Sequence, residues 1–138
     1  MNTARIPAAL AALMLLGPPV LGSPEAAAQD YAPGEKLTMI NCGRCHKVSE
    51  KDRMGGIGST PSFAVMRTWE NWEEKMKAFW TYRPHPSFTQ IEGVTAPFPE
   101  DRPPFVHPIS LTLDELRVII DYARSIEPAD LGPDWELR

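Results

Sequence analysis

The two cysteines of this 138-residue chain lie three positions apart, and a histidine directly follows the second. The segment Cys42-Gly43-Arg44-Cys45-His46 therefore has the form CxxCH. A zinc site is disfavoured because the chain has no second cysteine pair. A thiol–disulfide exchange site of the thioredoxin type is disfavoured because no strand-like run precedes Cys42. One disulfide is the ordinary interpretation of two cysteines in an exported protein, but the spacing argues for another use.

CxxCH is the attachment signature of c-type haem, in which each thiol bonds a haem vinyl group and the imidazole binds the iron. A helical turn places two sulfurs at this spacing along one edge of the macrocycle and points the next residue at its centre. The motif therefore predicts one covalently attached haem c, bonded by Cys42 and Cys45, with His46 as an axial ligand of the iron.

The first 28 residues have the pattern of a secretory signal peptide. Arg5 supplies a positive charge, the apolar run from Ile6 to Leu16 is too short to span a bilayer, and Ala26-Ala27-Ala28 offers a cleavage site. We expect a mature domain of residues 29–138, located in the periplasm and without a membrane span after cleavage. The alternatives are an uncleaved amphipathic anchor and a buried helix. Export agrees with the motif, because bacteria attach c-type haem outside the cytoplasm.

With these features the chain resembles a bacterial class I c-type cytochrome, a member of the monohaem cytochrome c family, over residues 33–127. Residues 34–42 are similar to the N-terminal helix of that family, with Gly34 eight positions before the first cysteine. Thr38 stands where the family usually has an aromatic residue, and Tyr122 resembles the aromatic residue of its C-terminal helix. The resemblance implies an all-α fold, a small domain of about three to four helices around the haem.

The family also implies a partner for the proximal histidine. A proline after its haem motif accepts a hydrogen bond, at the backbone carbonyl, from the histidine Nδ1–H. Pro61 resembles this proline, and such a bond would orient the His46 ring and strengthen it as a ligand. The alternative is that Thr60-Pro61 is only a turn.

Local patterns predict the other elements. Pro33 suits the first turn of a helix that ends around His46, and the Gly-rich segment 47–61 is expected to be a loop. Residues 68–82 are expected to form one amphipathic helix capped by Thr68, with its tryptophans against the haem edge or in the core. Thr112-Leu113-Asp114-Glu115 has the form of a capping box and predicts a helix that ends before Pro128. The Pro-rich segment 84–108 is expected to be a long irregular loop, and the tail 128–138 to be loosely ordered.

The second axial ligand is where the sequence departs from the family. The family commonly has a methionine followed by proline just ahead of the C-terminal helix, but this chain has no methionine after Met76. His107-Pro108 occupies the matching position, so we expect His46 and His107 to ligate the iron together. The alternatives are an iron without a sixth ligand, or ligation by His85, Met54 or Met66.

The charge balance bears on the class of function. The chain has 14 Lys and Arg against 18 Asp and Glu, a net charge of −4, which disfavours general binding to nucleic acid. No nucleophile motif or phosphate-binding loop is present in the sequence. We therefore expect a periplasmic electron carrier or the electron-accepting subunit of an oxidoreductase, not itself an enzyme, whose redox partner has a basic docking patch. The alternatives are a haem enzyme or gas-binding protein with an open sixth position, and an interaction module that docks through its Pro-rich loop.

Overall fold

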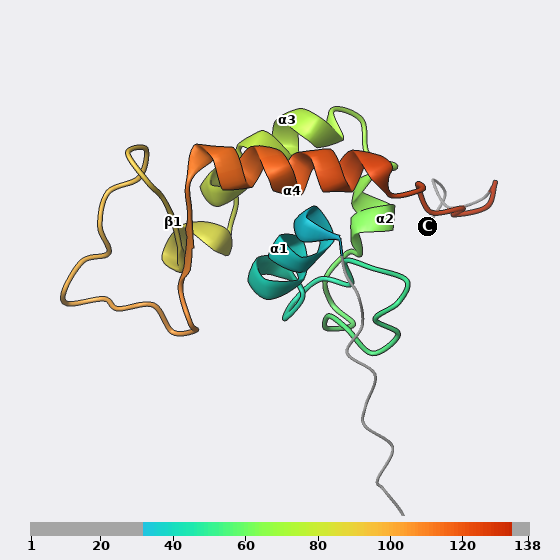
Figure 1. Cartoon of the computed structure of the whole chain (residues 1–138). Coiled ribbons are helices and arrows are strands. Elements are labelled where there is room, and N and C mark those ends of the chain that lie inside the picture. The colour runs from blue at the N-terminus through green and yellow to red at the C-terminus, as the bar shows by residue number, and fades with distance from the viewer. Residues whose placement is uncertain (1–31, 134–138) are drawn as a thin grey trace, which may run out of the picture.

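The structure, a computed structural model, describes residues 32–133. The expected signal peptide and its cleavage site lie outside this range, as does the end of the tail. Four α-helices, two short 3-10 helices and two three-residue strands make up the described part (Figure 1). In chain order they are α1 (Pro33–Cys42), α2 (Phe63–Met66), α3 (Trp72–Lys77), η1 (Phe79–Thr81), η2 (His85–Ser87), β1 (Thr89–Ile91), β2 (Ile109–Leu111) and α4 (Leu113–Ser125).

Helix α4 begins at the predicted capping box. The Thr112 hydroxyl accepts a hydrogen bond from the Glu115 backbone N–H at 3.1 Å, and the Glu115 carboxylate accepts one from the Thr112 N–H at 2.8 Å. Together these bonds satisfy two backbone donors that a helix start leaves free. One face of the helix is buried, through Leu116, Ile119, Ile120 and Ala123. Helix α4 is therefore both capped at its start and strongly amphipathic, and α1, α3 and β2 pack on it.

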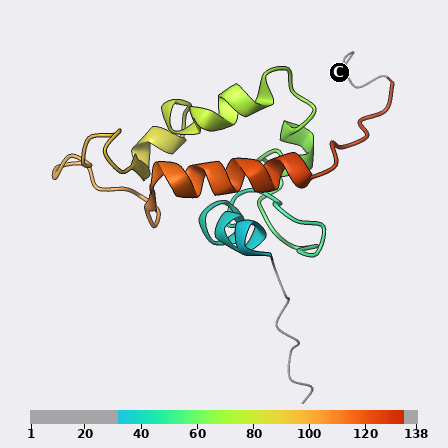
Figure 2. The same cartoon turned by 45° about the horizontal axis from the view of Figure 1, so that its top comes forward.

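Helix α1 lies against α4 in both views (Figure 1, Figure 2). Gly34 permits the close approach, because a Cβ atom at this position would lie 3.1 Å from the Tyr122 Cβ. Thr38 is fully buried, and its hydroxyl donates to the Gly34 carbonyl at 2.8 Å. The Tyr122 hydroxyl donates to the Val48 carbonyl at 2.8 Å. The crossing therefore joins α1, α4 and the start of the loop 47–61.

The prediction of a single helix over residues 68–82 is wrong. Asn71 has a left-handed backbone conformation, with φ at 55°, and this interrupts the helical path before α3 begins at Trp72. The Thr68 hydroxyl donates to the Val65 carbonyl at 2.8 Å, so it closes the end of α2 and does not cap α3. Ser62 is the residue that caps α2, by accepting from the Val65 N–H at 3.1 Å.

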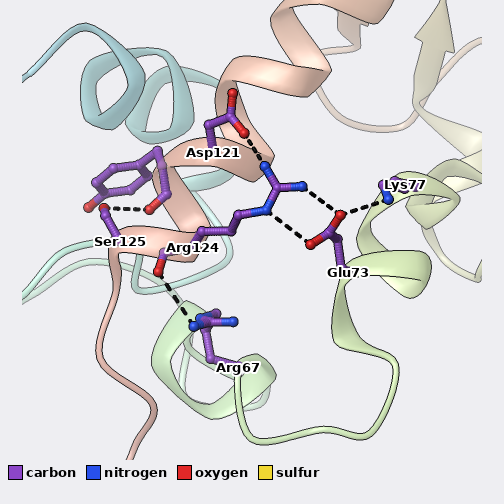
Figure 3. Close-up of polar contacts among 7 residues, drawn as sticks. Arg67, Glu73, Lys77, Asp121, Arg124 and Ser125 are labelled. Carbon is purple, nitrogen blue, oxygen red and sulfur yellow. Dashed lines mark hydrogen bonds and ion pairs between the residues drawn. The ribbon is translucent and has the colours of Figure 1, made fainter.

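An ion-pair group joins α3 to α4 (Figure 3). The Glu73 carboxylate accepts hydrogen bonds from Arg124 at 3.0 and 2.5 Å and pairs with Lys77 at 2.7 Å. The hydrogen bonds from Arg124 and Lys77 lower the pKa of Glu73 to about 2. Arg124 also pairs with Asp121 on its own helix. The group holds the short helix α3 along α4, and α3 in turn carries residues of the site described below.

The segment 84–108 is more ordered than the expected irregular loop. It contains η2 and β1, and β1 pairs in parallel with β2 in the register Thr89↔Ile109, Gln90↔Ser110 and Ile91↔Leu111. The Ile109 N–H donates to the Phe88 carbonyl at 2.8 Å, and the Glu92 N–H donates to the Leu111 carbonyl at 2.9 Å. This strand pair was not predicted, and it differs from a purely helical fold. It draws both ends of the Pro-rich segment into the molecule.

The hydrophobic core lies where α4, α2 and the strand pair meet. Its buried side chains come from the segments before, within and after the Pro-rich region, so the core depends on contacts between distant parts of the chain. They are Val48, Phe63, Ile91, Leu111, Ile119 and Ala123. Trp72 and Trp80 pack against this cluster, which favours the core interpretation of the tryptophans.

Candidate functional site

An apolar cavity lies beside the CxxCH segment. About 90 Å³ of it is wide enough for a water molecule. Cofactor and ligand sites commonly have about 300–1,000 Å³, so a group as large as haem would require the lining side chains to move apart. Cys42, Cys45 and His46 line the cavity, together with His85 and apolar side chains of α2, α3, η1, β2 and α4. The sequence motif therefore borders a small cavity whose lining is almost wholly apolar.

The two cysteines are held on one helical turn. Cys42 is the last residue of α1, and its carbonyl accepts hydrogen bonds from the Cys45 N–H at 3.1 Å and the His46 N–H at 2.9 Å. Both thiols are free. Burial, and to a smaller extent the neighbouring Cys45, raises the pKa of the Cys42 thiol to about 12. Thiol–disulfide exchange depends on a lowered cysteine pKa, so this environment does not favour the exchange interpretation.

The loop 47–61 folds back over the motif. The Gly56 N–H donates to the Gly43 carbonyl at 3.1 Å, and the Ile57 N–H donates to the Cys45 carbonyl at 3.0 Å. Gly56 has a positive φ of 77°, and a Cβ there would lie 2.6 Å from the Lys47 nitrogen. The glycine is therefore needed both for the backbone conformation and for the close approach of the loop.

The ring of His46 is oriented by Pro61. The distance from His46 Nδ1 to the Pro61 carbonyl oxygen is 2.8 Å. A carbonyl oxygen can only accept, so Nδ1 carries a proton and Nε2 is the nitrogen that could bind a metal. Pro61 directly precedes Ser62, the N-cap of α2, which fixes the position of this carbonyl. The hydrogen bond expected from the resemblance is thus present.

His85 has a closely similar arrangement on a different part of the chain. Its Nδ1 lies 3.1 Å from the Tyr82 carbonyl oxygen, which also accepts the His85 backbone N–H at 3.0 Å. The His85 ring contacts Phe79 edge-on at 5.2 Å between ring centres and Phe88 at 5.7 Å. Burial lowers the pKa of His85, and the charge of His46 acts in the same direction, against the hydrogen bond to Tyr82. The neutral imidazole, which is the form that binds metals, is therefore favoured.

The structure brings His85, and not His107, to the cavity with His46. The ring centres of His46 and His85 are 6.1 Å apart, and their planes differ by 14°. His107 is exposed and does not belong to the cavity lining. The physical reason is the strand pair. It draws residues 109–111 alongside β1, and His107 lies before this pairing, on the surface.

The two methionines considered as alternative ligands also differ in whether they reach the cavity. Met54 is 93% exposed, whereas Met66 lines the cavity from α2. Met76 of α3 also lines it, as does Phe88. Met76 lies within the amphipathic segment expected over residues 68–82, whereas no pattern in the sequence indicates a role for Phe88. Phe88 could have been found only through the strand β1 that follows it. That strand has three residues, which are too few to show an alternating pattern in the sequence.

The residues of the cavity fit a haem. Two thiols lie on one turn at its edge, an imidazole with a free Nε2 follows them, and the rest of the lining is almost wholly apolar. A bare metal ion fits less well, because residues 32–133 contain no cluster of three or more His, Cys, Asp or Glu side chains able to hold one. Haem supplies four equatorial nitrogens of its own, so the protein needs to provide only axial ligands.

No family model, curated protein or solved structure matches the chain. Within residues 32–133, no helix combines the length and apolar character needed to cross a membrane.

Proposed function

We propose that this chain carries one covalently attached haem c and transfers electrons in the periplasm, as a soluble carrier or as the electron-accepting subunit of an oxidoreductase. The observation that carries the proposal is the placement of His46. Its ring lies at an apolar cavity next to both cysteines, with Nδ1 bonded to the Pro61 carbonyl at 2.8 Å. The resemblance of the sequence to class I c-type cytochromes supports the same conclusion.

Each part of the site has a physical task in this function. Cys42 and Cys45 would bond the haem, which supplies a reversible one-electron couple when bound. The Pro61 carbonyl keeps the His46 ring in one orientation and makes Nε2 a stronger donor. Apolar side chains such as Phe79 and Leu116 exclude water from the cavity, and this lowers the local dielectric constant. Electron transfer requires no acid or base from the protein.

The proposal is tested by producing the full chain in a bacterial host that exports it and attaches c-type haem. The wild-type protein is expected to keep its haem after denaturation, to gain the mass of one haem, and to be reduced and reoxidised reversibly by one electron. A Cys42→Ser, Cys45→Ser double variant is the matched control, and it is expected to lose haem on denaturation. An exported wild-type chain without covalent haem would overturn the proposal.

A further inference from the structure

We infer that His85 supplies the second axial ligand of the haem iron, so that the site has two imidazole ligands. This inference rests on the proposed function, because it assumes that the chain carries haem. It differs from the expectation drawn from the sequence, in which the ligand was His107. The position of His85 within the Pro-rich segment is a property of this chain and does not follow from the CxxCH motif.

The first observation behind the inference is the state of the two rings. Each Nδ1 donates to a backbone carbonyl, that of Pro61 for His46 and that of Tyr82 for His85. Neither Pro61 nor Tyr82 lines the cavity, although both histidines do. Each ring is therefore held at Nδ1 by an acceptor outside the cavity, which leaves Nε2 as the nitrogen that could bind a metal. A metal-binding histidine is commonly oriented by such a bond at its other nitrogen.

The second observation is the separation of the rings. A metal–imidazole bond is about 2 Å long and the nitrogen lies roughly 1 Å from its ring centre, so two imidazoles on opposite sides of one metal have centres roughly 6 Å apart. The centres of His46 and His85 are 6.1 Å apart. The separation of the two ring centres is therefore close to that of two imidazoles that ligate one iron.

The third observation is that His85 is fixed in place before any ligand binds. Its backbone N–H and its ring both bond the Tyr82 carbonyl, at 3.0 and 3.1 Å. The Phe88 N–H donates to the His85 carbonyl at 3.0 Å, and the rings of Phe79 and Phe88 pack on the imidazole. Little conformational entropy remains to be lost on ligation, which favours tight binding at the sixth position.

Two imidazole ligands have a functional consequence. A methionine ligand raises the reduction potential of a c-type haem, and replacement of the thioether by a second imidazole removes that effect. The carrier would therefore work at a lower potential than a relative with His and Met ligands. A filled sixth position also prevents carbon monoxide from reaching the iron, so the site would be suited to electron transfer rather than to gas binding.

The direct test compares His85→Ala with His107→Ala in the haem-loaded full chain. Wild type and His107→Ala are expected to be low-spin, to show the electron paramagnetic resonance signature of two imidazoles, and to bind no carbon monoxide when reduced. His85→Ala is expected to become high-spin and to bind carbon monoxide at once, and added imidazole is expected to restore the low-spin spectrum. Loss of the low-spin state in His107→Ala, with His85→Ala unchanged, would overturn the inference.

A second variant covers the case in which His85→Ala fails to accumulate. His85→Met keeps a ligating side chain and is expected to stay low-spin, to exchange the signature of two imidazoles for that of imidazole and thioether, and to have a higher reduction potential. A wild-type spectrum that already shows a thioether ligand would overturn the inference, with Met66 or Met76 as the ligand. In that case the covalent haem, and with it the proposed function, would still stand. A wild-type chain without haem would overturn both.

Discussion

Glu35 is a buried carboxylate that links α1 to the loop carrying Pro61. Its two oxygens accept hydrogen bonds from the Ser49 hydroxyl at 2.5 Å and the Lys51 ammonium at 2.8 Å. Burial acts to raise the pKa of Glu35, but the hydrogen bonds from Lys51 and Ser49 and the charge of Lys51 together lower it below 4.5. The carboxylate therefore adds stability above about pH 4.5, and this contribution is lost as the pH falls through the folded-state pKa.

We predict that Glu35→Gln lowers the free energy of unfolding at pH 7 by about 1–3 kcal/mol, because a buried charged hydrogen bond is lost. The variant is also expected to lose less stability than wild type when the pH is taken below 4.5. Urea unfolding followed by far-ultraviolet circular dichroism at both pH values measures these differences. Glu50→Gln is the control, since its side chain is 84% exposed and the expected change is below about 0.5 kcal/mol. Equal losses in the two variants would contradict this role for Glu35.

At the scale of elements, the crossing of α1 and α4 depends on the absence of a side chain at Gly34. A Cβ there would lie 3.1 Å from the Tyr122 Cβ and 3.4 Å from the Val118 carbonyl oxygen. Both atoms belong to the rigid part of α4, so a larger residue must push the helices apart. The displacement would also strain the hydrogen bond from Tyr122 to the Val48 carbonyl.

We predict that Gly34→Val destabilises the protein by about 1–3 kcal/mol through overpacking at this crossing. The same substitution at Gly58 is the control, because no atom lies within 4 Å of a Cβ built there. Thermal unfolding of the two haem-loaded variants measures the difference. A Gly34→Val protein as stable as wild type would show that the helices separate at no cost, contrary to the close packing at this position.

Elements that depend on neighbouring residues were predictable from the sequence, and those that depend on distant contacts were not. The Thr112 capping box and the Pro33 helix start each use residues within one helical turn, and both are present. The break at Asn71 and the pairing of β1 with β2 have no such local signal. The strands are three residues long and their partners are twenty positions apart, so no periodic pattern could indicate them.

At the scale of the whole molecule, His46 and His85 also differ in this respect: a local motif predicts His46, whereas the placement of His85 depends on distant contacts. Cys42, Cys45 and His46 were predicted from a five-residue motif, and Pro61 from its resemblance to a proline of class I c-type cytochromes. A prediction of the second axial ligand of the proposed haem requires knowledge of which loop returns to the cavity. Spacing from the C-terminal helix favoured His107, but the parallel strand pair leaves that residue on the surface and fixes His85 beside the cavity. The choice depends on tertiary structure that a single sequence does not encode in any local pattern.

The net charge of the whole molecule should govern how it would meet the redox partners of the proposed function. The expected cleavage after residue 28 would take away one base, Arg5, and one acid, Glu25, and leave the net charge at −4. The propionates of the proposed haem would add further negative charge. Attraction to a cationic partner raises the rate of encounter by about 10- to 1,000-fold at low salt, and salt screens it over a Debye length of about 10 Å at 0.1 M.

We predict opposite salt effects for small oxidants of opposite charge. The reduced haem-loaded protein is expected to be oxidised more slowly by hexaamminecobalt(III), a cation, as salt rises from about 10 mM to about 1 M, with a fall of roughly tenfold. Oxidation by ferricyanide, an anion, is expected to become faster over the same range, because salt screens its repulsion from the acidic protein. Stopped-flow absorbance of the haem measures both rates.

Ferricyanide serves as the control for a general effect of salt on the haem, since such an effect would change both rates in the same direction. A parallel response to the two oxidants would therefore contradict electrostatic steering by the acidic surface, and with it the expectation of a basic docking patch on the partner.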